Sequence, residues 1–221
     1  MALAAAACIA GIALGNWQAG RAEEKRSLDA QLAQALASAP VEISSRAANS
    51  QSLVLKRVAA KGRLIDEYTV FLDNKLRRGR AGYEVVTPLK LDGMHVLVNR
   101  GWVAGGRTRE ELPKVPVPAG ITRIEGLALA RLPHALEPGP ASAGKVRQNI
   151  DIDAFARETG LRLQPVFIQQ YSPADDGLVR DWPRPDAGAE KHASYALQWY
   201  SLAVLAVVLL IVLSIRRARP R

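Results

Sequence analysis

Of the three histidines in this sequence, His192 has the neighbours most suited to binding chemistry. It lies where the chain enters a long apolar segment, and Tyr195 and Trp199 follow it at helical spacing. In a helix these three side chains share one face. An imidazole beside aromatic rings at a membrane surface can bind the iron of a haem as an axial ligand. The alternative is an interfacial histidine whose ring only reaches headgroup water.

The other candidate groups favour ordinary structural roles. His95 follows an Asp92-Gly93 turn and is predicted to be a surface or cross-strand residue, and His134 lies in a proline-flanked loop. The sequence contains no Walker loop, no G-x-S-x-G and no H-E-x-x-H motif. The single cysteine, Cys8, can form neither an internal disulfide nor a thiolate metal cluster. We therefore expect a protein that is not an enzyme.

The charge distribution argues against a nucleic-acid-binding protein. The chain has 221 residues and a formal net charge of +9, with 30 Lys and Arg against 21 Asp and Glu. Four of the arginines lie in the last six residues: Arg216, Arg217, Arg219 and Arg221. The remaining excess is mild and dispersed, without the concentrated basic patch or motif that nucleic-acid interfaces use. The length suits one domain of ordinary size together with membrane anchors.

The C-terminal segment predicts a transmembrane helix over residues 193–215. Within 196–215 the only polar residues are Gln198, Ser201 and Ser214. A helix of about twenty residues spans roughly 30 Å, the thickness of a hydrocarbon core. Aromatic residues stand at its start and arginines at its end, and positive residues remain on the cytoplasmic side. The tail 216–221 is therefore expected inside, and the preceding domain outside.

The N-terminal segment predicts a first transmembrane helix over residues 1–17. Its apolar run, 2–14, is short, Trp17 would mark the interface, and charges begin at Arg21. No basic stretch precedes the run and no cleavage site follows it, which favours an anchor over a signal peptide. Two cytoplasmic termini would place a domain of residues 18–192 on the periplasmic side of a bacterial inner membrane.

The region between the anchors reads as a helix followed by short strands. Leu28, Leu32 and Leu36 recur at i, i+4 and i+8 and predict a helix over 18–38. Residues 53–171 predict a sheet domain, and 172–192 a return loop rich in Pro, Gly and Asp. Runs rich in β-branched and aromatic residues predict strands at 53–58, 69–72, 83–91, 94–103, 121–129 and 166–171.

Two local signals refine this sheet domain. Asp92-Gly93 is a strong hairpin turn. Asp151 and Gly160 would cap a short helix over 152–159. Strands in hairpin order with helices mainly at the ends predict an extramembrane α+β domain, formed mainly by an antiparallel sheet or a partly closed barrel.

Several segments carry a family resemblance, and together they span almost the whole chain. They are LGNWQ at 14–18, LDN at 72–74, GYEVVTPL at 82–89, VLVNRGWV at 96–103 and HASYALQW at 192–199. On these motifs the sequence resembles the surfeit-locus protein family, which are assembly factors of cytochrome c oxidase. The sequence departs from the family at Glu190 and Lys191, where asparagines are frequent, and at Lys75, where arginine is common.

The resemblance implies a role in maturing a haem-copper oxidase. It implies haem A as a transient cofactor, delivered to subunit I of the oxidase, with haem A synthase as a second partner. His192 would be the haem ligand, with Tyr195 and Trp199 beside it and Trp17 and Gln18 facing it from the first anchor. Arg100 would either pair with a haem propionate or make a structural hydrogen bond to a loop carbonyl. The alternative function is a membrane-anchored scaffold for oxidase subunits that binds no haem.

Overall fold

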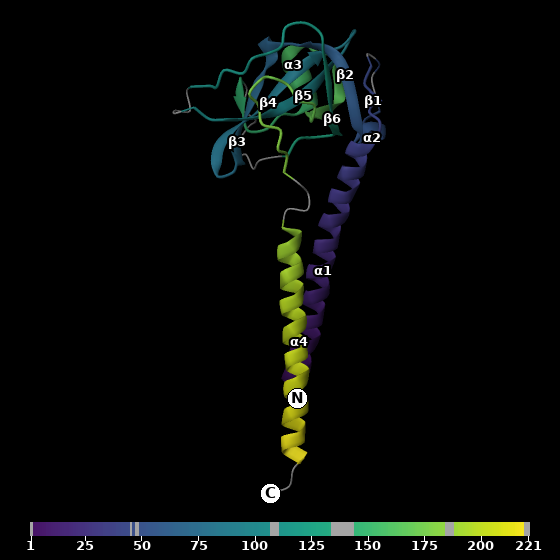
Figure 1. Cartoon of the computed structure of the whole chain (residues 1–221), viewed down its shortest axis with the longest axis vertical. Helices are drawn as coiled ribbons and strands as arrows, with labels where there is room; N and C mark the ends of the chain where they lie inside the picture. Colours follow the sequence, from purple (N-terminus) through teal and green to yellow (C-terminus); the bar gives the residue numbers. More distant parts are fainter. Residues whose placement is uncertain are drawn as a thin grey trace. The chain divides into compact units, whose positions relative to one another are not determined.

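The chain folds as two compact units. The computed structural model describes residues 2–44, 46, 49–106, 111–133, 144–183 and 188–218, so His134, Arg219 and Arg221 lie outside it. The helical unit comprises Met1–Ala33 and Pro183–Arg221, and the barrel unit comprises Gln34–Trp182. Figure 1 shows both units and labels most of their helices and strands.

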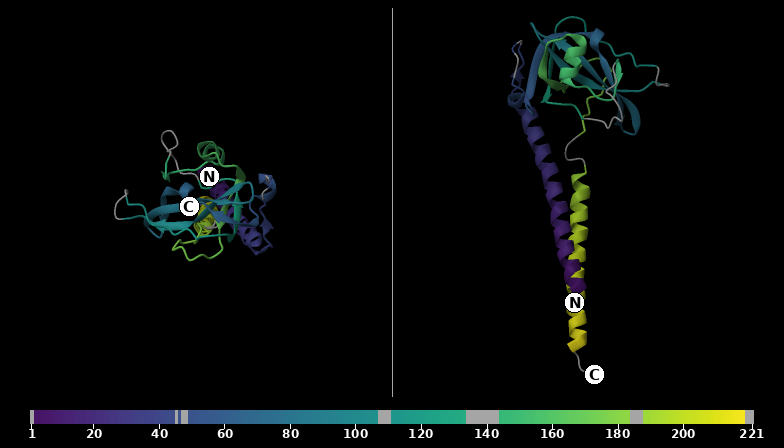
Figure 2. Two further views of the ribbon diagram at one scale, coloured as in Figure 1. Left: turned by 90° about the horizontal axis from the view of Figure 1, so that it is seen from above. Right: turned by 180° about the vertical axis from the view of Figure 1, so that it is seen from behind.

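The helical unit consists of two long helices, α1 (Ala2–Ala37) up to Ala33 and α4 (Ala189–Ala218). They run side by side in opposite directions (Figure 2). The α4 segment Ala189–Arg217 has a mean hydropathy of 2.4, and by length and composition it could cross a membrane. It is the one such helix among the described residues, so the transmembrane helix predicted over residues 1–17 is not confirmed. In α1 the apolar run is cut short by Asn16 and Gln18.

Small residues let α1 and α4 approach closely. A Cβ added at Gly11 would lie 3.0 Å from the Cβ of Ala203, and one at Gly15 would meet the ring of Tyr200. The buried alanines of α4 include three that recur at seven-residue intervals, namely Ala189, Ala196 and Ala203. This spacing keeps one seam of a helix facing its partner, and small residues at such a seam are typical of helices that pack within membranes.

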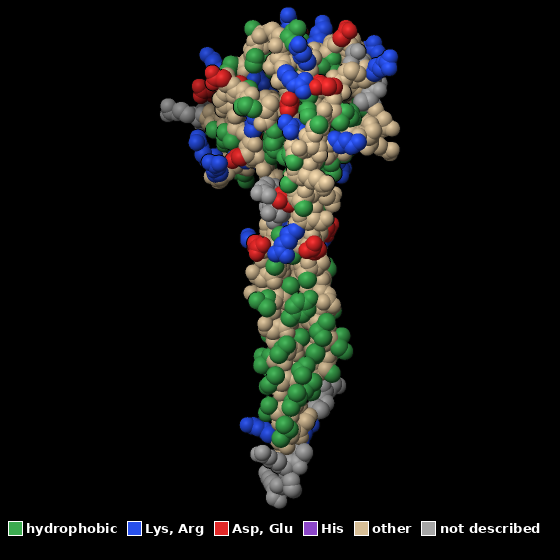
Figure 3. All heavy atoms as spheres, turned by 45° about the vertical axis from the view of Figure 1, so that its right-hand side comes forward, with side chains coloured by type: hydrophobic (Ala, Val, Ile, Leu, Met, Phe, Trp, Pro, Cys, Tyr) green, Lys and Arg blue, Asp and Glu red, His purple; other side chains and the backbone are tan. Residues whose placement is uncertain are grey.

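Apolar side chains cover the outside of this helix pair. Figure 3 shows them gathered along the helices, between a band of acidic and basic side chains at one end and Lys and Arg at the other. Exposed apolar residues on α4 include Leu197, Val204 and Ile211. Such a surface is suited to lipid rather than to water.

The barrel unit is built on five strands that close on themselves. The order is β2-β6-β8-β5-β4, and a pairing of β2 with β4 completes the ring. Of the five strand pairs in the ring, β5–β8 is parallel and the other four pairs are antiparallel. The prediction of a mainly antiparallel sheet or barrel is therefore confirmed. These strands are β2 (Arg57–Leu64), β4 (Arg80–Lys90), β5 (His95–Ala104), β6 (Thr122–Leu129) and β8 (Leu163–Gln170).

Closure of the barrel depends on a residue without a side chain. Arg63 and Leu64 of β2 pair with Lys90 and Leu89 of β4. A Cβ at Gly62 would collide with the Lys90 carbonyl oxygen, so glycine permits the two backbones to meet here. Apolar side chains fill the interior, among them Val58, Ala60, Val96, Val98, Ile124 and Ile168.

Shorter elements extend and cover the barrel. Asp151 caps α3 by accepting a bond from the Ala154 N–H, and Gly160 ends it in the left-handed conformation, as predicted. The α3 helix covers one side of the barrel (Figure 1), where Phe155 is buried. The strand predicted at 53–58 is wrong in its first half, since Asn49 caps a helical turn there. The remaining elements are β1 (Val41–Glu42), α2 (Ser50–Leu53), η1 (Asp66–Tyr68), β3 (Val70–Arg77), β7 (Val146–Arg147) and α3 (Ile152–Thr159).

Candidate functional site

In the helical unit, His192 lies against Gln18. The Nδ1 atom of His192 is 2.6 Å from the Oε1 atom of Gln18, and both side chains are partly buried. Gln18 lies seven residues after Gly11 on the seam of α1, and His192 lies four residues before the buried Ala196 on α4. The two side chains therefore form a polar pair within a seam otherwise made of small residues.

This contact fits the tautomer of His192 in which Nδ1 carries the proton. An amide oxygen only accepts hydrogen bonds, so Nδ1–H of His192 is the donor to Gln18. In the neutral ring Nε2 then keeps its lone pair. No described residue hydrogen-bonds to Nε2. Histidines that bind metals commonly have one ring nitrogen anchored in this way and the other free for the metal.

A hollow of about 450 Å³ adjoins His192. Trp17 lines it, as do two cationic side chains, Arg21 and Lys25. Arg21 donates to Glu24 at 2.7 Å, and the side chains of this pair are 54% and 57% exposed, so they remain within reach of a ligand. Leu28 completes the lining.

Sequence analysis placed Trp17 at this site but missed the other α1 residues that line the hollow. Trp17, Arg21, Glu24 and Leu28 are separated by four, three and four residues. That spacing places them on one helical face, and it could have been read from the sequence.

The other two aromatic residues predicted at the site lie outside this lining. Tyr195 is 50% exposed. Trp199 is partly buried, and its carbonyl faces Gly11 across the seam. Among the described residues there is no group of three or more His, Cys, Asp or Glu that could hold a metal ion. The chemistry available is thus one imidazole donor, flanked by an indole ring and by cations.

Arg100 lies in the barrel unit and has a different environment. Val85 pairs with Gly101 and Val86 with Asn99, so Arg100 is the extra residue of a β-bulge. The residue is 0% exposed. Its Nη2 donates to the Asp176 carboxylate at 3.0 Å and to the Pro116 carbonyl at 2.7 Å. Burial lowers the pKa of the Arg100 guanidinium, and the Asp176 charge opposes that effect.

The residues around Arg100 fasten the segment that leads out of the barrel. Asp176 also accepts from Arg180 at 2.6 Å. Trp102 and Val179 exchange two backbone hydrogen bonds of 2.8 Å. Gly101 has φ +146°, and a Cβ there would lie 2.8 Å from the Leu178 Cβ. The motif at 99–102 therefore holds residues 176–180 against β5. The bond from Arg100 to the Pro116 carbonyl is a structural hydrogen bond to a loop carbonyl, one of the two roles predicted for Arg100.

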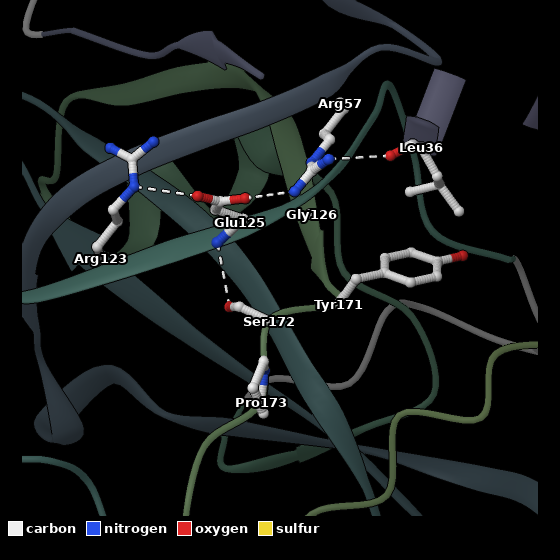
Figure 4. A pocket seen from close by; sticks show the side chains of 8 residues that line it. All are labelled: Leu36, Arg57, Arg123, Glu125, Gly126, Tyr171, Ser172 and Pro173. Carbon is white, nitrogen blue, oxygen red and sulfur yellow. Dashed lines mark hydrogen bonds and ion pairs between the residues drawn. The ribbon is translucent and has the colours of Figure 1, made fainter. Parts of the chain in front are cut away.

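A second hollow, of about 520 Å³, lies on the barrel beside Arg57 and Glu125 (Figure 4). Arg57 donates to Glu125 at 2.8 Å and to the Leu36 carbonyl at 3.1 Å. Arg123 donates to the other oxygen of Glu125 at 3.1 Å, and the bond from Arg57 is the larger cause of the lowered Glu125 pKa. The charges of this hollow are paired with one another, so it offers no free cation or base.

Comparison with known proteins places these motifs in a family. The model of the SURF1 family matches residues 4–204. A SURF1-like protein of Rickettsia felis is 24% identical over 212 residues, covering 91% of this chain and 90% of that protein. A SURF1-like protein of Rickettsia conorii is 25% identical over 222 residues, covering 91% and 85%.

A shorter match has higher identity. A SURF1-like protein of Dictyostelium discoideum is 33% identical over 101 residues, which covers 41% of this chain and 37% of that protein. The family match includes the motif at 99–102 in the barrel unit, and both His192 and Gln18 in the helical unit. The chain belongs to the SURF1 family, the surfeit-locus family that its sequence resembles.

Proposed function

We propose that this protein is a membrane-anchored assembly factor for a haem-copper terminal oxidase, which receives haem A and helps to deliver it to subunit I. The contact between His192 and Gln18 carries the proposal, because it leaves one imidazole nitrogen available as a ligand. Haem A is the cargo, and its iron supplies redox chemistry to the client oxidase. The protein itself needs only to bind the group, orient it and release it.

The residues around His192 suit a group of this kind. An aromatic ring, Trp17, borders the hollow and can pack against a porphyrin face. Arg21 and Lys25 line the same hollow, and cations of this type suit the carboxylates of haem propionates. Tyr195 and Trp199 would contribute at the outer margin. Arg100 already binds Asp176 and Pro116, which supports its structural role over a propionate contact.

The proposed topology has α1 and α4 both crossing a bacterial inner membrane, with both termini in the cytoplasm and the barrel unit in the periplasm. The hydropathy of α4 and the basic residues at its end support this orientation. The small-residue contacts at Gly11 and Gly15 support α1 as its partner within the membrane. On this topology, α1 and α4 would contact subunit I and haem A synthase within the membrane.

The test is a visible spectrum of the full chain, purified in detergent from cells that make haem A. We expect the wild type to carry haem A and His192→Ala to lose it. The matched control is Gln198→Ala, which removes an exposed polar side chain from the same helix and should keep the pigment. A colourless wild type from cells shown to contain haem A would overturn the proposal and favour the haem-free scaffold.

A further inference from the structure

On the outer face of β2, the charged side chains are paired with carboxylates at the start of the strand and, within the described part of the chain, unpaired at its end. In the second half of this strand exposed and buried residues alternate, with Lys61 and Arg63 exposed on either side of the buried Gly62. Near its start, Arg57 is bound by Glu125. The neighbouring Arg123 is bound by both Glu125 and Glu42. This end of the face is therefore neutralised by the protein's own carboxylates.

The other end of β2 gathers cations instead. Lys61 stands directly opposite Arg123 on β6, and Arg63 stands directly opposite Lys90 on β4. Like charges directly opposite each other destabilise a sheet. Among the described residues, no ion pair involves Lys61, Arg63 or Lys90. The fold thus places three uncompensated cations together.

These cations surround a groove of about 650 Å³. Its lining includes Lys61, Gly62, Arg63, Lys90 and the single acidic residue Asp92. Ile121, which also lines the groove, is 68% exposed and gives it one apolar side chain. The combination of a hollow, three cations and an apolar margin is typical of a surface that receives another molecule.

We propose that this groove binds an extended, acidic segment of a partner protein, with carboxylates at alternate positions facing Lys61 and Arg63. Two residues of a strand span about 7 Å, so Lys61 and Arg63 have the spacing at which an extended chain presents every second side chain. Lys90 and Ile121 bind a further carboxylate and an apolar side chain of the same segment. A hollow favours a narrow polypeptide over the flat surface of a lipid bilayer.

The experiment uses the full chain in phosphatidylcholine nanodiscs and a short fluorescent peptide in which Glu alternates with Thr. We expect binding that weakens as salt is added. Changing Lys61, Arg63 and Lys90 together to Gln should weaken binding about tenfold, since each exposed contact contributes modestly. A scrambled peptide of the same composition, with adjacent glutamates, should bind more weakly than the alternating one.

The matched control replaces three exposed cations elsewhere on the barrel unit, Lys56, Arg80 and Arg131, by Gln. This variant has the same net charge as the first and should bind the peptide nearly as well as the wild type. Equal weakening in both variants, or no peptide binding by the wild type, would overturn the proposal. The unfolding temperature of the first variant should equal or exceed that of the wild type, because it removes two like-charge pairs.

A second measurement addresses lipid as the occupant. Hydrogen exchange of the wild type is compared in nanodiscs with and without phosphatidylglycerol, in the absence of peptide. We expect no change at residues 61–65 and 90–92. Slower exchange there with the anionic lipid would identify a lipid surface as the occupant and would reject the acidic polypeptide.

Discussion

The helical unit and the barrel unit each contain a polar side chain predicted to contact haem, His192 and Arg100, and the two side chains differ in how deeply they are buried. Arg100, in the barrel unit, is completely buried and bound to Asp176 and Pro116. The ring of His192, in the helical unit, hydrogen-bonds to Gln18 and lies beside an open hollow. The two sequence motifs therefore have different roles. The motif around Arg100 maintains the fold, and the motif around His192 leaves a side chain available to a ligand.

The comparison also distinguishes two uses of a hydrogen bond. The bond from Arg100 to Asp176 joins residues 76 positions apart and holds the barrel's exit segment in place. The bond from His192 to Gln18 orients a ring whose other nitrogen is free. Loss of the first should therefore appear as unfolding, and loss of the second as weaker ligand binding in a folded protein.

The largest effect is expected from Arg100→Met. The change leaves the buried Asp176 with Arg180 as its remaining cation, and breaking one side of a buried ion pair costs about 3–5 kcal/mol. Thermal unfolding of the purified full chain would measure the loss. Arg131→Met removes an exposed arginine and should change stability by less than about 0.5 kcal/mol. A stable Arg100→Met protein that no longer bound haem would reverse the roles assigned to the two units.

An intermediate effect is expected from Gln18→Leu. Without the acceptor, Nδ1 of His192 is no longer oriented, and loss of such a supporting bond lowers metal affinity about 10- to 100-fold. Haem A titration followed by absorbance would give the affinity, while stability should fall by only about 1 kcal/mol. The matched control is Asn16→Ala, which removes another bond between the helices, from Tyr200 to Asn16 at 2.8 Å. Equal affinity losses in both variants would mean that helix packing, rather than ring orientation, governs binding.

The smallest effect is expected from an ion pair of the barrel unit between the buried Arg147 and the exposed Glu158. Hydrogen bonds from Arg147 lower the pKa of Glu158 below its ordinary value of 4.5. The pair therefore contributes stability above pH 4.5, and this contribution is lost as the pH falls through the lowered pKa. Because Glu158 is 42% exposed, we expect only a few tenths of a kcal/mol. Unfolding at pH 7 and pH 3 should show a slightly smaller acid loss in Glu158→Gln, and an unchanged loss would contradict the assignment.

Local signals predicted much of the barrel unit. The α3 helix, its two caps and the Asp92-Gly93 turn follow from residues close together in the chain. Closure of the barrel could not be predicted in this way. It depends on the two-residue pairing of β2 with β4 and on the parallel pairing of β5 with β8, which join segments far apart in the sequence. No periodicity encodes such partners.

The candidate site divides in the same manner. His192 and its α4 neighbours could be recognised from local chemistry, and the family resemblance added Gln18 and Trp17. Asp176, the partner of Arg100, could not be predicted, because it is distant in sequence and belongs to no motif. The positive φ of Gly101 likewise gives no signal until the Leu178 side chain is seen above it.

The openness of the hollow beside His192 has a kinetic consequence. It measures about 450 Å³ and is bordered by side chains that are largely exposed, including Arg21 and Glu24. A group held there through one ligand atom keeps much of its surface uncovered, so dissociation meets few contacts that must break together. Differences in affinity are expressed mostly in the dissociation rate. On the proposed function, brief residence is an advantage, because a carrier that held its cargo for long would withhold it from the oxidase.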